Sequence, residues 1–276
     1  LQDATPITLG QEFSGYSKMV EQSIARINSN LPFLYQLAQG GTAVGTGINT
    51  HKDFGRLIAQ ELSNITNLNF KEADNHFEAQ ATQDSIVHLS GSLKTLSVSL
   101  YKIANDIRWL GSGPRSGLGE LILPAVQPGS SIMPGKVNPV ICESLIQVCA
   151  QVIGNDAVIN QGGLGSYFEL NVMLPLIGSN LLESINILSN GTIMFTDKLV
   201  DGLGADEKIC SDYVESSLAM CTSLVPEIGY DKAAELAYKA YKSGKTIREI
   251  AIQENILEES ILDKLLDPIS MTKPNK

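Results

Sequence analysis

The sequence predicts an all-α protein whose main part is a bundle of long helices. Three observations predict this: apolar residues recur at steps of three and four over long segments, no useful stretch alternates apolar and polar residues, and breaks rich in glycine and proline separate the periodic segments. We expect residues 1–206 to form the bundle. Residues 207–276 have shorter and more charged helical patterns, and we expect them to form a small C-terminal helical domain.

The first two helices are predicted from apolar stripes on either side of a turn. Thr8 can cap a long helix whose stripe runs from Leu9 to Leu34. The glycine-rich segment 40–47 could bring N–H groups close to an anion, but no strand pattern precedes it, so a structural turn is favoured over a dinucleotide loop. Residues 51–65 then predict a shorter helix.

The clearest element is the segment from Ile86 to Leu110, where apolar residues alternate three and four apart throughout. This pattern predicts a helix packed lengthwise against similar partners. A loop at 111–117 ends it, and two further helical patterns follow, at 141–152 and at 174–188. Together these segments predict a bundle shared between subunits.

Composition narrows the classes of function. The 276 residues carry a net charge of −10, which disfavours a surface for nucleic acid or for an anionic membrane. No apolar run approaches the length of a membrane-spanning helix, and four cysteines without zinc-type spacing favour a reducing, intracellular compartment. Only 18% of the residues are charged, which suggests that other subunits cover part of the surface. We therefore expect a cytoplasmic protein that binds neither nucleic acid nor membrane.

The segment Gly129-Ser-Ser-Ile-Met-Pro-Gly-Lys-Val-Asn138 is the strongest candidate for a functional site. It holds two hydroxyls, an ammonium and a carboxamide, and its glycine and proline residues predict a loop between two helices. The next helical pattern carries Glu143 in its first turns. A polar connection that merely faces water is the alternative interpretation.

Several chemistries lack support in this loop. The spacing of Gly129, Gly135 and Lys136 differs from that of a phosphate-binding loop, and there is no Gly-x-Ser-x-Gly elbow. The three histidines, His51, His76 and His88, do not pair at metal-ligand spacing. A serine beside a cation remains, and such a hydroxyl acts as a base only when loop N–H groups and a positive charge stabilise its oxyanion. Lys136 could supply that charge or pair with a substrate carboxylate, to which Asn138 could donate a hydrogen bond.

The loop from Gly129 to Pro139 resembles the loop motif of the fumarase/aspartase superfamily, and the resemblance extends over the whole chain. The segments that resemble class II fumarases are 1–6, 40–49, 102–109, 168–172 and 228–234. Gly135 and the pair Tyr230-Asp231 favour class II fumarase over aspartate ammonia-lyase.

This resemblance implies the reversible hydration of fumarate to L-malate, an anti addition through a carbanion-like intermediate, with neither metal nor cofactor. It implies a homotetramer whose active sites are shared between subunits, in the cytoplasm or in the mitochondrial matrix of a eukaryote. Ser130 matches the catalytic serine, which takes the C3 proton of malate. Ser131, Lys136 and Asn138 match the ligands of the substrate carboxylates, and Glu143 matches the acidic residue that orients and charges a catalytic histidine.

The chain departs from the family at that histidine, which in the family stands just ahead of the segment matching residues 1–6. None of the three histidines matches it. We therefore expect a C-terminal fragment without the N-terminal domain, with little activity alone. Two alternatives stay open: aspartate ammonia-lyase or another lyase of the superfamily, and a non-catalytic module for oligomerisation or binding.

Overall fold

The structure is a computed structural model and describes residues 2–274. Helices dominate this part of the chain, so the predicted all-α class is confirmed. Between residues 2 and 274, the eleven α-helices are α1 (Leu9–Leu34), α2 (Phe54–Thr66), α3 (His76–Ala81), α4 (Asp84–Leu110), α5 (Val140–Gly163), α6 (Leu174–Lys198), α7 (Glu207–Ser216), α8 (Val225–Ile228), α9 (Tyr230–Ser243), α10 (Ile247–Gln253) and α11 (Glu259–Leu265). None of the helices described is both long enough and apolar enough to cross a lipid bilayer.

The chain divides into two compact units, which are described separately. The bundle unit consists of Tyr16–Trp109 and Leu123–Leu203. Among the described residues, the terminal unit consists of those up to Gly15, of Leu110–Ile122 and of those from Gly204 onward. The predicted domain boundary at residue 206 stays a prediction.

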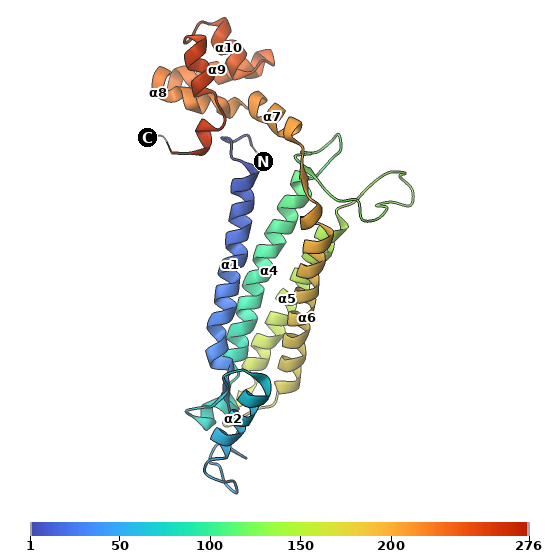
Figure 1. Cartoon of the computed structure of the whole chain (residues 1–276), viewed down its shortest axis with the longest axis vertical. Helices are drawn as coiled ribbons and strands as arrows, with labels where there is room; N and C mark the ends of the chain where they lie inside the picture. The colour runs from blue at the N-terminus through green and yellow to red at the C-terminus, as the bar shows by residue number, and fades with distance from the viewer. Residues whose placement is uncertain (1, 275–276) are drawn as a thin grey trace. The chain divides into compact units, whose positions relative to one another are not determined.

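In the bundle unit, α4, α5, α6 and the part of α1 from Tyr16 onward run side by side (Figure 1). Hydrogen bonds between buried side chains join neighbouring helices. Asn30 near the end of α1 donates to Ser92 Oγ near the start of α4 at 3.0 Å, and Ser90 donates to Asp156 Oδ1 of α5 at 2.7 Å. Successive helices are therefore antiparallel. The apolar core of the bundle includes Leu93, Leu100, Ile107, Leu145, Val152, Ile159, Ile177, Leu181 and Leu188.

Short pairings close the connections at the helix ends. In the bundle unit, β1 (Gln36–Leu37) pairs in parallel with β2 (Lys71–Glu72), and β4 (Ser166–Tyr167) pairs antiparallel with β5 (Leu170–Asn171). In the terminal unit, β3 (Leu121–Ile122) pairs antiparallel with β6 (Gly204–Ala205). Each strand has two residues, which agrees with the absence of a strand pattern in the sequence.

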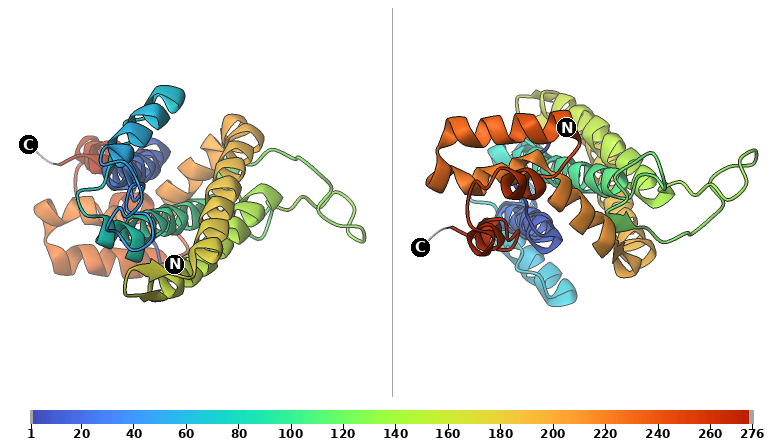
Figure 2. Two further views of the ribbon diagram at one scale, coloured as in Figure 1. Left: turned by 90° about the horizontal axis from the view of Figure 1, so that it is seen from below. Right: turned by 90° about the horizontal axis from the view of Figure 1, so that it is seen from above.

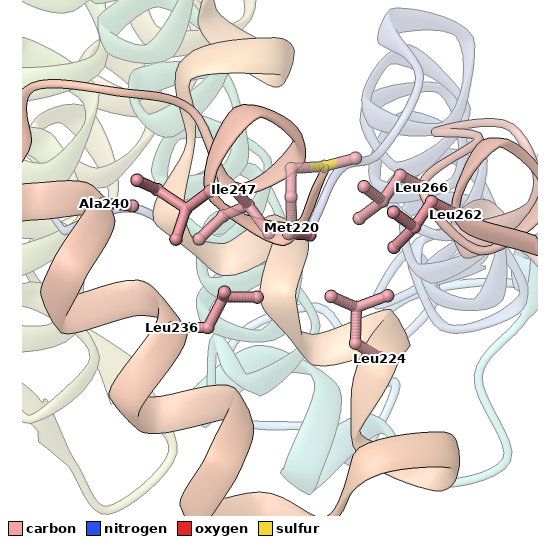
Figure 3. Close-up of a cluster of buried hydrophobic side chains, with 9 residues drawn as sticks. Met220, Leu224, Leu236, Ala240, Ile247, Leu262 and Leu266 are labelled. Atoms are coloured by element: carbon pink, nitrogen blue, oxygen red, sulfur yellow. The ribbon is translucent and has the colours of Figure 1, made fainter. Parts of the chain in front are cut away.

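The terminal unit has its own apolar core, formed by α9, α10, α11 and a 3₁₀-helix at Leu218–Leu224. Figure 3 shows seven of its members converging: Met220, Leu224, Leu236, Ala240, Ile247, Leu262 and Leu266. Local signals set the helix ends. A capping box between Thr246 and Glu249 begins α10, and Gly244, with a φ of 68°, ends α9 in a left-handed conformation that glycine adopts without strain.

Two thiols are buried inside the bundle. Cys142 and Cys149 lie on the inner face of α5, and burial raises the pKa of Cys142 to about 12 and that of Cys149 to about 11. A buried thiolate is unfavourable because it loses its hydration.

These thiols predict a loss of stability at alkaline pH. Below the pKa of an unfolded thiol, about 8.5, both thiols are protonated in the folded and the unfolded chain, and their contribution to the free energy of unfolding is fully present. As the pH rises from there toward the folded values, the unfolded chain releases protons that the folded chain retains, and the free energy of unfolding falls by up to about 1.4 kcal/mol per pH unit for each thiol. Urea unfolding at several pH values measures this effect. In the double variant Cys142→Ala/Cys149→Ala, the free energy of unfolding should fall less steeply with rising pH than in the unmodified chain. Parallel curves for the variant and the unmodified chain would contradict the assignment.

Candidate active site

The serine loop, Gly129–Asn138, belongs to the bundle unit and leads directly into α5. Figure 2 shows this part of the chain, in light green, running out from the ends of the bundle helices. Pro139 separates the loop from α5, where a proline fits because a helix start leaves backbone N–H groups unpaired. The predicted loop between two helices is therefore confirmed.

The loop turns back on itself and closes at a narrow neck. The N–H of Gly129 donates to the carbonyl of Lys136 at 2.8 Å, and the side-chain amide of Asn138 donates to the carbonyl of Gly129 at 2.9 Å. A Cβ at position 129 would stand 2.5 Å from the backbone nitrogen of Asn138, so only glycine allows this approach. Gly135, with a φ of 77°, makes the return turn in a conformation that favours glycine.

Ser130 is held by the backbone of its own loop. The N–H groups of Ile132 and Met133 both donate to Ser130 Oγ, at 3.1 and 2.9 Å. Two N–H donors aimed at one oxygen are an arrangement that can stabilise negative charge on that oxygen. The Ser130 side chain is half-buried, whereas Ser131 beside it is exposed.

Lys136 provides a positive charge on the same loop. Its side chain is exposed, and its ammonium forms no ion pair with any residue between 2 and 274. A lysine without a partner in a chain of net charge −10 is available to an anion from outside.

Glu143 lies in the first turn of α5 and pairs with a residue that the sequence analysis did not single out. Arg108, in the last turn of α4, places Nη2 3.9 Å from Glu143 Oε1 and donates from Nη1 to Asn105 Oδ1 at 3.0 Å. Because α4 and α5 are antiparallel, the end of one meets the start of the other. In the sequence, the only sign of a role for Arg108 in the site was its position at the end of a predicted helix, just before the loop at 111.

The structure therefore brings some of the predicted site residues together and leaves others apart. Asn138 is hydrogen-bonded to Gly129, the residue directly before Ser130. Glu143 has no hydrogen bond or ion pair to a side chain of the serine loop within the described chain. Within residues 2–274, the side chains of Ser131 and Lys136 form no hydrogen bond or ion pair with Ser130, Asn138 or Glu143, although the backbone carbonyl of Lys136 accepts from the N–H of Gly129.

The histidines and other metal-ligand side chains do not add to this site. His76 Nε2 lies 3.2 Å from the carbonyl of Gln39 and 3.3 Å from Glu72 Oε1, and the ring of His88 lies against that of Phe33. Across residues 2–274, no group of three or more histidine, cysteine, aspartate or glutamate side chains is placed to hold a metal ion.

Known proteins are similar to this chain over almost its whole length. A protein family described as Lyase matches residues 1–154, and one described as Fumarase C C-terminus matches residues 220–273. The mitochondrial fumarate hydratase of Dictyostelium discoideum is 53% identical over 271 residues, which are 98% of this chain and 56% of that protein. The class II fumarate hydratase of Methylorubrum extorquens is 50% identical over 275 residues, 100% of this chain and 58% of that protein.

Solved structures agree with these sequence matches. Class II fumarase from Schistosoma mansoni superposes with a TM-score of 0.93 at 41% identity and covers 100% of this chain and 60% of its own. A fumarate lyase:delta crystallin from Brucella melitensis, bound to cobalt, also gives 0.93, at 45% identity over 99% of this chain and 59% of its own. This chain thus spans between 56% and 60% of the length of these proteins. With a matched family over more than half of its residues, the chain belongs to the lyase family and, within it, to the class II fumarases.

Proposed function

We propose that this chain supplies the serine loop of a fumarate hydratase, which adds water reversibly to fumarate and forms L-malate. The observation that carries the proposal is the pair of N–H groups on Ser130 Oγ, on a loop that also bears the unpaired ammonium of Lys136. A weakly basic hydroxyl needs this combination to act on a carbon acid.

In the direction from malate to fumarate, the Ser130 alkoxide takes the proton from C3. The electron pair left on C3 spreads into the adjacent carboxylate, which gains negative charge as the bond breaks. Lys136, Asn138 and Ser131 offer an ammonium, an amide and a hydroxyl to the substrate carboxylates, and donors at that position stabilise the transition state more than the ground state. The electron pair then forms the C2–C3 double bond, and the C2 hydroxyl leaves as water after receiving a proton.

Glu143 serves that last step through a histidine that is not among the 276 residues. A carboxylate beside an imidazole orients the ring and favours its protonated form. The Arg108 guanidinium lies 3.9 Å from Glu143 Oε1 and pairs with this carboxylate. Glu143 is in this proposal the residue that prepares the acid, while Ser130 is the base.

Assembly into a homotetramer belongs to the same proposal. Large apolar side chains stay exposed along the bundle helices, among them Val98 at 58%, Leu182 at 62% and Ile193 at 56%. Such positions on long helices favour packing against further copies. The relatives include mitochondrial enzymes and bacterial class II enzymes, and we propose a location in the cytoplasm or the mitochondrial matrix.

The test uses a hybrid protein in which the part of the Dictyostelium discoideum relative that precedes its region of similarity is fused ahead of residue 1. We expect the hybrid to convert malate to fumarate, measured by the ultraviolet absorbance of fumarate, and residues 1–276 alone to show little turnover. A folded tetrameric hybrid with no turnover would contradict the proposal. Release of ammonia from aspartate by the same hybrid would instead support an ammonia-lyase. A hybrid that assembles into oligomers but has no affinity for dicarboxylates would support an oligomerisation module.

A further inference from the structure

The neck of the serine loop uses both backbone polar groups of one residue. The N–H of Gly129 donates to Lys136, and its carbonyl accepts from the side-chain amide of Asn138, at 2.8 and 2.9 Å. Gly129 directly precedes Ser130, whose hydroxyl oxygen accepts hydrogen bonds from the N–H groups of Ile132 and Met133. The path of the chain through Ser130 is therefore fixed at one end by the neck and at the other by these two donors.

We infer that Asn138 is a positioning residue, whose side chain closes the neck and thereby keeps Ser130 Oγ on its two amide donors. The catalytic meaning of this role rests on the proposed function, while the hydrogen-bond pattern stands without it. A primary amide carries two N–H donors. One is used at Gly129, and the other remains for a substrate carboxylate, so Asn138 positions the base and contacts the substrate at the same time.

Two substitutions on opposite sides of the neck test this role. Asn138→Leu keeps much of the side-chain volume and loses the donor, while Asn138→Asp keeps the shape and faces the carbonyl of Gly129 with acceptor oxygens only. Gly129→Ala acts from the other side, because its Cβ would stand 2.5 Å from the nitrogen of Asn138 and 2.8 Å from the carbonyl oxygen of Lys136. The matched control is Val137→Thr, at an exposed position inside the same neck.

The experiment uses NMR to measure the rate of hydrogen exchange at individual backbone amides of the 276-residue chain. In the unmodified chain the amides of Gly129, Ile132 and Met133 should be protected. We expect Asn138→Leu and Asn138→Asp to speed exchange at all three by about tenfold, the factor that corresponds to one net hydrogen bond at the upper part of its usual range. Gly129→Ala should do the same at Ile132 and Met133, and Val137→Thr should change none of them.

Ser130→Ala distinguishes the effect of the neck from the effect of the Ser130 hydroxyl. It should speed exchange at Ile132 and Met133, which lose their acceptor, and leave Gly129 protected. Unchanged exchange at Ile132 and Met133 in the Asn138 variants would overturn the inference, and so would an unprotected Gly129 in the unmodified chain.

Turnover of the hybrid gives the second readout. If Asn138 positions Ser130, Gly129→Ala should lower kcat about tenfold with little change in KM, although Gly129 offers no side chain to the substrate. If closure of the neck does not hold Ser130 in place, Gly129→Ala will keep its kcat, and the inference fails. A hybrid that hydrates no fumarate would sink the proposed function, whereas the exchange data would still decide the role of the neck.

Discussion

Ser130→Ala should lower the turnover of malate by the hybrid by roughly 10²–10⁴-fold, the usual contribution of a general base. The reason is local: the two N–H groups of Ile132 and Met133 stabilise an oxyanion only where an oxygen is present. Because the loop extends from the bundle, the change should leave folding and assembly intact, which circular dichroism and sedimentation will check.

A matched control for this variant is Ser189→Ala, which removes a hydroxyl from an exposed position on α6. It should turn over malate at the rate of the unmodified hybrid. A Ser130→Ala hybrid that stays within about threefold of the control would exclude Ser130 as the base, because general-base catalysis contributes more than that.

Asp156→Ala should give the largest loss of stability among the charged residues of the bundle, about 3 kcal/mol in the free energy of unfolding. Its buried carboxylate accepts from the Ser90 hydroxyl at 2.7 Å and from the Lys94 ammonium at 2.5 Å. The variant leaves a buried hydroxyl without its acceptor and an ammonium without its counter-charge. Because the Lys94 side chain is 42% exposed, it can turn toward water, which keeps the loss near the lower end for a broken buried pair.

Urea unfolding followed by circular dichroism measures this loss. Asp212→Ala is the control, since it removes the same charge from a pair with Lys208 whose side chains are 63% and 84% exposed. Solvent screens exposed pairs strongly, so the control should unfold almost as the unmodified chain does. Equal losses in the two variants would contradict the view that burial makes Asp156 important.

The long helices could be predicted from the sequence because their apolar stripes repeat over many turns. The pattern from Ile86 to Leu110 lies within α4, and Thr8 caps α1 by accepting from the N–H of Gln11 at 3.1 Å. The helix predicted at 51–65 begins later, at Phe54. Short elements carry too few repeats for such an argument, and α3 was missed although Asn75 accepts from two N–H groups at its start.

The candidate site could be predicted as a set of residues, but not as a geometry. Glycine and proline marked the serine loop because both residues restrict or free the backbone in known ways. That Ser130 Oγ meets the amides of Ile132 and Met133 depends on how the loop folds back, which local preferences do not determine. The pairing of Arg108 with Glu143 joins residues 35 positions apart and required the antiparallel packing of α4 on α5.

The most direct measurement of the proposed chemistry follows the C3 hydrogen of malate itself. The hybrid is incubated with malate in deuterium oxide, and the label at C3 is measured by NMR over time. If Ser130 takes that hydrogen, the unmodified hybrid will introduce deuterium at C3 and the Ser130→Ala hybrid will leave C3 unlabelled over the same period. Labelling at an equal rate in both proteins would show that another group removes the hydrogen, and the account of the serine loop given above would be wrong.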